Sequence, residues 1–250
     1  MIINQDKNIR ITIQYEGSRY QGWQKQDSTE NTLQGKFEAI LTKMAGEQVE
    51  VQASGRTDAG VHAYGQVANF HIKTQMQPIE IMAYLNRYLP EDVAVVAATE
   101  ADNRFHSRLS ARSKTYCYRV LNSEVPHIFE RRYVYRISEQ LDMQAMQRAA
   151  TRLLGTHDYK AFTSTKKGKK STVRTITKIN IERIGEEIRF TYCGDGFLYH
   201  MIRILTGTLL EVGQGRMNEG HIIEIMQSGL RAQAGPLVPA QGLTLMEVSY

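Results

Sequence analysis

The chain contains few of the residues that build covalent frameworks. Its 250 residues include two cysteines, Cys117 and Cys193, together with one tryptophan and five prolines. The two cysteines form no CxxC pair and show no zinc-ligand spacing. We therefore expect a reduced protein with buried thiols and without a metal site.

Long apolar runs and nucleotide-binding motifs are also lacking. No stretch approaches the roughly 18 apolar residues of a transmembrane helix, and the segment from Met1 to Lys7 has no signal-peptide core. Neither a P-loop nor a GxGxxG motif is present. Together with the two isolated cysteines, the lack of apolar runs predicts a cytoplasmic protein that has no membrane partner.

Positive charge is modest in total but unevenly distributed. The net charge is +5. One basic cluster lies between positions 166 and 174 and consists of Lys166, Lys167, Lys169, Lys170 and Arg174. A second cluster consists of Arg104, Arg108, Arg112 and Lys114. Such clusters suit contacts with the phosphates of a nucleic acid, although a solvated basic loop is the alternative interpretation.

Hydrophobic periodicity predicts strands and helices in alternating order. The expected strands cover residues 9–15, 66–74, 93–98, 115–121, 173–184, 187–193 and 243–250. The expected helices cover residues 31–45, 140–154, 197–212 and 218–228, with one more that starts at Pro78. Asn31 is the expected N-cap of the first helix and Gly46 its C-terminal stop. Residues 163–172 are polar and basic, which is typical of a flexible surface loop.

The order of elements repeats in the two halves of the chain, which indicates an α+β fold with two similar lobes. We expect each lobe to be a mostly antiparallel sheet with helices on one face. The expected domains are residues 1–105 and residues 106–250.

One loop carries the pattern of an active site. Residues 54–63 read SGRTDAGVHA, so that Asp58 lies between Gly55 and Gly60 and two residues after Arg56. Glycine permits tight turns, and a nearby arginine favours the ionised form of a carboxylate. A rigidly held anion is what a nucleophile or a base requires. A simple surface turn is the alternative, since Asp and Gly are common in turns.

Six motifs in a fixed order extend this pattern over nearly the whole chain, from about Ile11 to Tyr250. They are Tyr15–Gly17 with Gly22–Gln26, the Asp58 loop, Phe105–Arg108 leading to Lys114–Tyr118, Gly155–Tyr159, Gly194–Arg203 and Gly235–Leu243. This ordered set closely resembles the tRNA pseudouridine synthase A family.

The resemblance implies a function and a role for each matching residue. Asp58 matches the catalytic aspartate, expected as nucleophile, and Arg203 the basic residue that pairs with it. Tyr116 matches the tyrosine that packs against the target base, and Arg56 the arginine that holds the target nucleotide out of the stack. The family is a homodimeric isomerase without a cofactor, acting on uridines 38, 39 and 40 of the tRNA anticodon arm. We accordingly expect the lobes to join in one extended sheet with a central basic cleft, and the 166–174 cluster to touch the tRNA backbone.

Several alternatives stay open. Asp58 can attack the ribose, attack the base or abstract a sugar proton. Arg203, surrounded by apolar residues, needs a buried partner, for which Asp195 and Glu211 are candidates besides Asp58. An RNA-binding protein without catalysis and a glycosidase-type hydrolase are rival functions, but the hydrolase usually needs a second carboxylate.

Three other residues with chemically versatile side chains are expected to be structural. His62 is expected to pack or hydrogen-bond near the loop, and Trp23 to anchor the core. His157, followed by Asp158, is expected to belong to a structural turn after a helix.

Overall fold

The fold consists of two compact units. A computed structural model describes residues 5–165 and 171–250. The first unit comprises Met1–Arg112 and Leu245–Tyr250, and the second comprises Ser113–Thr244. Contacts within the chain thus divide it after Arg112, seven residues later than the expected boundary at 105, and group the last strand with the first unit. The expected mixture of α+β elements with mostly antiparallel strands is confirmed.

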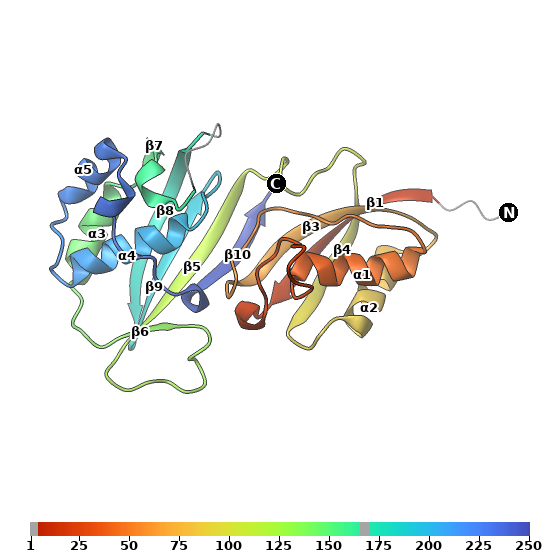
Figure 1. Ribbon diagram of the computed structural model, residues 1–250, viewed down its shortest axis with the longest axis horizontal. Coiled ribbons are helices and arrows are strands. Elements are labelled where there is room, and N and C mark those ends of the chain that lie inside the picture. The colour runs from red at the N-terminus through yellow and green to blue at the C-terminus, as the bar shows by residue number, and fades with distance from the viewer. Residues whose placement is uncertain (1–4, 166–170) are drawn as a thin grey trace. The chain divides into compact units, whose positions relative to one another are not determined.

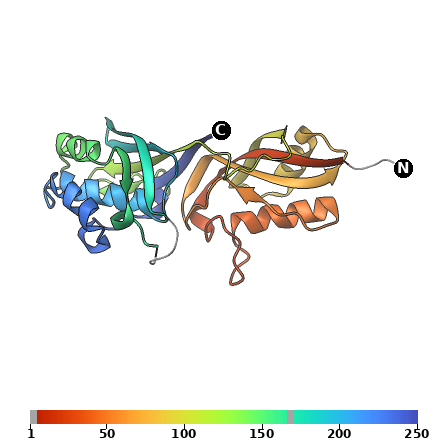
Figure 2. The ribbon, with the colours of Figure 1, turned by 90° about the horizontal axis from the view of Figure 1, so that it is seen from above.

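The first unit is an antiparallel sheet with helices on one face. Strand β1 lies between β3 and β4, and β2 pairs with β3. The strands are β1 (Gln5–Tyr15), β2 (Gln52–Ala53), β3 (His62–Thr74), β4 (Val93–Ala101) and most of β10 (Leu243–Ser249). The helices are α1 (Leu33–Ala45), α2 (Pro78–Tyr88) and the short 3-10 helix η1 (Gly17–Arg19). Helices α1 and α2 lie on the same side of the sheet (Figures 1 and 2).

The alternation in β1 determines which residues form the core. Ile9, Ile11 and Ile13 are fully buried, as the period of two predicts. Each such side chain contributes about 1.5–3 kcal/mol when it leaves water. Asn8 and Arg10 point to the opposite face of the sheet, which is therefore free to carry polar contacts.

The helix ends follow local chemistry, with one correction. Thr32, and not Asn31, caps α1, because its side chain accepts a hydrogen bond from the Gly35 N–H. Asn31 instead donates its side-chain amide to the Arg19 carbonyl, and this contact holds the end of η1. Gly46 ends the helix in the left-handed conformation with φ 74°, as expected. Pro78 opens α2.

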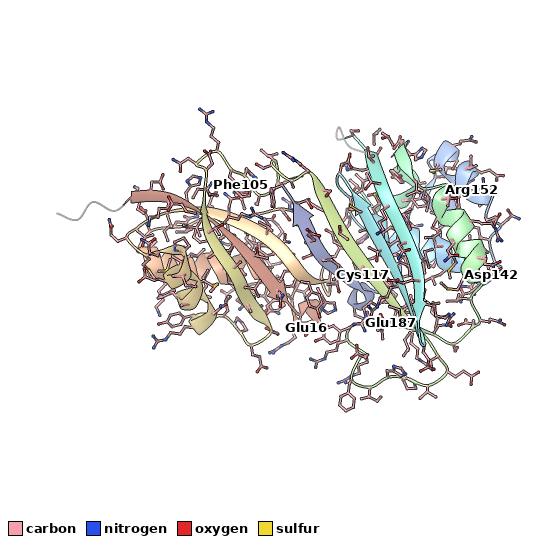
Figure 3. All side chains as sticks on the ribbon, turned by 180° about the vertical axis from the view of Figure 1, so that it is seen from behind. Glu16, Phe105, Cys117, Asp142, Arg152 and Glu187 are labelled. Atoms are coloured by element: carbon pink, nitrogen blue, oxygen red, sulfur yellow. The ribbon has the colours of Figure 1, made fainter. Side chains whose placement is uncertain are left out.

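The second unit is a sheet in the order β5–β9–β8–β7, all antiparallel, with β6 parallel to β5. Its strands are β5 (Ser113–Asn122), β6 (Tyr135–Ile137), β7 (Gly155–Asp158), β8 (Val173–Ile184) and β9 (Glu187–Gly194). Its helices are α3 (Met143–Thr151), α4 (Met201–Gly213) and α5 (His221–Ser228), with 3-10 turns η2 (Lys160–Phe162), η3 (Arg231–Gln233) and η4 (Ala240–Gly242). The helices lie on one side of this sheet (Figure 1), and Figure 3 shows the other side, where Cys117 and Glu187 are labelled.

Three expectations for the second unit were wrong in detail. The helix predicted from residue 197 begins at Met201, because His200 adopts a left-handed backbone with φ 65° that a helix cannot include. His157 lies in strand β7, opposite Arg174 of β8, and not in a turn. Cys117 is buried as predicted, but Cys193 is half-buried.

Some expectations fall wholly or partly outside the described residues. Lys166, Lys167, Lys169 and Lys170 lie in the segment 166–170, which is not described. Across residues 5–165 and 171–250, no helix is long and apolar enough to cross a membrane. In the same residues no group of three or more His, Cys, Asp or Glu side chains is arranged to hold a metal ion.

Gly207 provides a test of the packing of α4. A Cβ atom at this position would lie 2.0 Å from the Pro236 carbonyl oxygen. Helix propensity alone favours Gly207→Ala by up to about 1 kcal/mol, but the backbone clash should dominate and lower the unfolding free energy by about 1–3 kcal/mol. Urea denaturation measures the change. Gly196→Ala is the control, because its nearest atoms are 3.7 Å away on the Arg174 side chain. A Gly207→Ala variant as stable as the parent would contradict the expected clash.

Candidate active site

The Asp58 loop connects β2 to β3 and is tied to the sheet by buried hydrogen bonds. The Tyr15 hydroxyl lies 2.8 Å from the Thr57 hydroxyl and accepts a 3.5 Å hydrogen bond from the Gln66 side-chain amide. Gln66 also donates to the Gly55 carbonyl at 3.0 Å and accepts from the Ser54 hydroxyl at 2.7 Å. These bonds hold Ser54, Gly55 and Thr57, which precede Asp58, against the sheet, so this part of the loop is firmly supported.

Burial strengthens this support. Burial raises the pKa of Tyr15 above its ordinary value, and the hydrogen bonds with Thr57 and Gln66 oppose that shift only in part. Tyr15 therefore keeps its proton at any pH near neutrality and can donate it to Thr57. Thr57 is buried, whereas Asp58 is half-buried and Arg56 is exposed. The neutral side chain of Thr57 thus anchors the loop, while the charged side chain of Arg56 is exposed.

Two glycines allow the chain after β1 to press against this loop. A Cβ at Gly17 would lie 2.0 Å from the Val61 carbonyl oxygen, and one at Gly22 would lie 2.8 Å from the Thr57 carbonyl oxygen. Gly22 also has a positive φ of 89°, which other residues rarely adopt. The Trp23 N–H donates to the same Thr57 carbonyl at 3.0 Å. Backbone therefore packs directly on backbone around Asp58.

His62 and Trp23, near the loop, have the structural roles expected of them. His62 is buried, and its Nδ1 accepts a 2.9 Å hydrogen bond from the Gly17 N–H. Nδ1 is therefore the unprotonated nitrogen of the ring, and His62 holds Gly17 in place. Trp23 is buried, and its ring stacks on Phe37 with centroids 6.1 Å apart.

The second unit carries the expected base-binding tyrosine. Tyr116 lies on β5 opposite Tyr192 of β9, and its buried ring meets the edge of Phe197 at 5.4 Å. The Tyr192 hydroxyl is 2.8 Å from the Thr206 hydroxyl of α4. The ring of Tyr116 is therefore fixed by the sheet beneath it and by an aromatic neighbour beside it.

Arg203 lies in the first turn of α4 and is half-buried. Its Nε donates to the Val238 carbonyl at 2.8 Å, and the Tyr118 hydroxyl donates to the adjacent Pro239 carbonyl at 2.7 Å. Burial raises the pKa of Tyr118, while the charge of Arg203 acts in the opposite direction. The segment from Val238 to Gly242 thus orients Arg203, and Gly242 leaves room for the Tyr118 ring, which a Cβ would approach to 2.7 Å.

Other carboxylates in the second unit have defined partners of their own. Glu211 forms an ion pair with Arg216 at 2.7 Å, and an oxygen of Asp195 accepts from the Thr175 N–H at 3.0 Å. Burial acts to raise the pKa of Glu187, but hydrogen bonds from Arg119 and Arg189 outweigh it and leave this pKa below its ordinary value. Each of these groups is engaged in a local structural contact.

The predicted site residues are divided between the two units. Asp58 and Arg56 belong to the first unit, and Tyr116 and Arg203 to the second. Arg174 lies at the start of β8 and donates to the carbonyls of Ser171 and Val173. Sequence reasoning missed the supporting residues, of which Tyr15, Gly17 and Gly22 stand in recognised motifs but without an assigned role.

Comparison with known proteins identifies the family. A family model described as tRNA pseudouridine synthase matches residues 11–109 and 149–250. The chain belongs to the tRNA pseudouridine synthase family. A protein of Bacillus sp. (strain KSM-64) named tRNA pseudouridine synthase A is 44% identical over 97% of this chain and 99% of its own length. A protein of the same name from Acetivibrio thermocellus is 43% identical over 98% of this chain and 100% of its own length.

A further relative and one solved structure complete the comparison. A Clostridium perfringens protein named tRNA pseudouridine synthase A 2 is 44% identical over 98% of this chain and 100% of its own length. A crystal structure of a Cbf5-Nop10-Gar1 complex matches with a TM-score of 0.37 and 12% identity, over 81% of this chain and 45% of the matched chain. That likeness is too low to carry an argument, and the family assignment depends on the sequence matches.

Tyr15→Phe tests the support of the Asp58 loop. The substitution keeps the ring but removes the oxygen that contacts the buried Thr57 hydroxyl and the Gln66 amide, while the Gln66 amide keeps its hydrogen bond to the Gly55 carbonyl. We expect the unfolding free energy to fall by about 1–3 kcal/mol, as measured by urea denaturation. Tyr64→Phe, at a side chain that is 62% exposed, is the control and should change stability by less than about 0.5 kcal/mol. Equal effects of the two substitutions would show that the buried hydroxyl does not stabilise the loop.

Proposed function

We propose that this chain is a tRNA pseudouridine synthase that isomerises uridine to pseudouridine at positions 38, 39 and 40 of the anticodon stem-loop. Membership of the family and near full-length relatives named tRNA pseudouridine synthase A support an isomerase that acts on tRNA. The observation that carries the site is the rigid loop that presents Asp58 beside an exposed Arg56. Resemblance to the family supports a cytoplasmic homodimer that works without a cofactor.

The reaction is a rearrangement with no net oxidation. The bond from uracil N1 to ribose C1′ breaks, the base turns, and a bond from C5 to C1′ forms. A proton leaves C5 and N1 gains one, so that substrate and product have the same atoms. A base inside a stem cannot turn, and the target nucleotide must therefore be flipped out of the stack.

Each residue has a task in this reaction. Asp58 either acts as a nucleophile, which attacks the ribose or the base, or acts as a base, which removes a sugar proton. Arg203 pairs with Asp58, as the resemblance to the family implies. Tyr116 provides the ring against which the flipped base packs, a contact that contributes roughly 1–3 kcal/mol. Arg56 holds the flipped nucleotide.

The basic cluster at 166–174 is proposed to hold the tRNA backbone. Charge clustering in the sequence supports this assignment for Lys166, Lys167, Lys169, Lys170 and Arg174. Such contacts release counterions and make binding dependent on salt.

Asp58→Asn tests the catalytic assignment. The substitution keeps the shape of the side chain but removes the charge, so pseudouridine formation should slow by at least about 10³-fold while the dissociation constant for tRNA changes little. Formation is followed by mapping pseudouridine in a tRNA transcript that carries uridines at positions 38, 39 and 40. Asp27→Asn, at an exposed carboxylate, is the control and should retain full activity.

Three outcomes would overturn the proposal. Pseudouridine formed at the parental rate by the Asp58→Asn variant would remove Asp58 from the chemistry. Binding of tRNA by the parent protein without any product would favour an RNA-binding protein. Release of free uracil would favour a hydrolase.

Replacing the four lysines between positions 166 and 170 by alanine tests the backbone contact. We expect weaker tRNA binding and a smaller slope of log Kd against log salt concentration, by about 0.7–0.9 for each phosphate that the variant no longer neutralises. Binding measured at several salt concentrations between about 50 and 200 mM provides the slope. An unchanged slope would mean that these lysines do not contact the tRNA.

A further inference from the structure

The segment of residues 102–112, called here the arginine strap, crosses the face of the first unit opposite α1 and α2. Two buried asparagines fasten it to the sheet. The Asn8 side-chain amide on β1 donates to the carbonyls of Asp102 at 2.8 Å and Phe105 at 2.9 Å. The Asn69 side-chain oxygen on β3 accepts from the Ser107 N–H at 2.8 Å. The two asparagines also bond to each other at 3.0 Å.

The C-terminal end of the chain fastens the strap a second time. The Tyr250 hydroxyl donates to the Ser107 carbonyl at 2.8 Å, and its ring packs against Phe105 with centroids 5.0 Å apart. The Arg10 guanidinium lies 4.5 Å from the Tyr250 ring centre, in the range of a cation–π contact. The Arg112 N–H donates to the Ser249 carbonyl at 2.8 Å. Figure 3 labels Phe105 on this segment.

These contacts make the strap a fixed structure. Asn8 and Ser107 are fully buried, and the Ser107 hydroxyl donates to the Gln52 carbonyl. A buried polar group that loses its partner costs about 1–3 kcal/mol, so the backbone of the strap has little freedom to rearrange. Side chains that project from it start from defined positions.

Three of the exposed side chains of the strap are cationic. Arg104, Arg108 and Arg112 are all exposed, and among the described residues none of the three has an ion pair. The strap contains a single carboxylate, Asp102, one oxygen of which accepts from the Arg104 N–H at 2.8 Å. The strap thus places three arginines on an ordered backbone, and the described part of the chain gives none of them a carboxylate partner.

We propose that the arginine strap binds the phosphate backbone of the RNA substrate. Arginine matches phosphate with paired N–H donors, and a support that is already ordered lowers the entropy cost of binding. The identity of that RNA as a tRNA rests on the proposed function. The strap is separate in sequence from the lysine segment and from Asp58, Tyr116 and Arg203, and its contact with phosphates adds affinity without reading the bases.

The test compares two triple variants in the full-length protein. The first is Arg104→Gln, Arg108→Gln and Arg112→Gln. The matched control is Lys36→Gln, Lys43→Gln and Arg87→Gln, which removes the same charge from α1 and α2 on the other face of the same unit. Binding of an unmodified tRNA transcript is measured at several salt concentrations. The strap variant should bind at least about tenfold more weakly at low salt, with a slope of log Kd against log salt reduced by about 2–3.

The remaining variants separate charge from fold. The control triple variant should keep the parental slope within about 0.5. A strap variant that carries Arg104→Lys, Arg108→Lys and Arg112→Lys should retain most of the slope, because the slope counts charges. If circular dichroism shows that the triple glutamine variant is unfolded, the three single variants decide, with a slope reduction of about 0.7–0.9 expected for each.

The outcomes for the strap and for the proposed function are distinguishable. If the parent protein forms pseudouridine and the strap variant keeps the parental slope of log Kd against log salt, the proposal that the strap binds RNA is overturned while the proposed function stands. A parent protein that forms no pseudouridine would overturn the proposed function, while the slope comparison would still decide whether the strap contacts RNA. Equal reductions of the slope in the strap and control variants would mean that binding follows net charge and would overturn the proposal as well.

Discussion

The hydrogen bonds that join Tyr15, Thr57 and Gln66 are the constraint on which the Asp58 loop depends. They connect the end of β1 to a loop that lies more than forty residues later and to β3 behind it. The three side chains are neutral and buried. They therefore support the loop that carries Asp58 without adding a charge next to it. The two glycines at 17 and 22 then allow neighbouring backbone to close on the loop without a side chain between.

Much of the architecture could be predicted from the sequence, because its signals are local. The alternation of Ile9, Ile11 and Ile13 predicted a half-buried strand, and the strands expected at 173–184 and 187–193 form the β8–β9 hairpin. The Asp58 loop was recognisable because its residues are contiguous. Strand β7 was missed, since four residues around His157 offer too short a pattern to register as a strand.

The parts that could not be predicted depend on contacts between distant residues. Tyr15 has the pattern of an ordinary core residue, and only its distance to Thr57 shows that it supports the loop. Arg203 was expected to need a buried partner, but nothing in the sequence indicated that its Nε donates to the Val238 carbonyl, 35 residues away. The apolar stretch from Phe197 suggested a helix, whereas the left-handed backbone of His200 delays the start of that helix to Met201, and Phe197 before it packs on Tyr116. Hydrophobic periodicity predicts neither such long-range contacts nor the backbone conformation of a single residue.

The bonds that fasten the arginine strap to the sheet involve neutral asparagine, serine and backbone groups. Dissolved ions screen attraction between charges but have little influence on buried neutral hydrogen bonds. Ionic strength therefore changes the affinity of the strap for RNA phosphates but not the structure of the strap. A change in the salt concentration inside a cell would therefore alter how long an RNA stays bound while the protein keeps its fold. Mutations of the exposed arginines can likewise change RNA affinity without changing the stability of the fold.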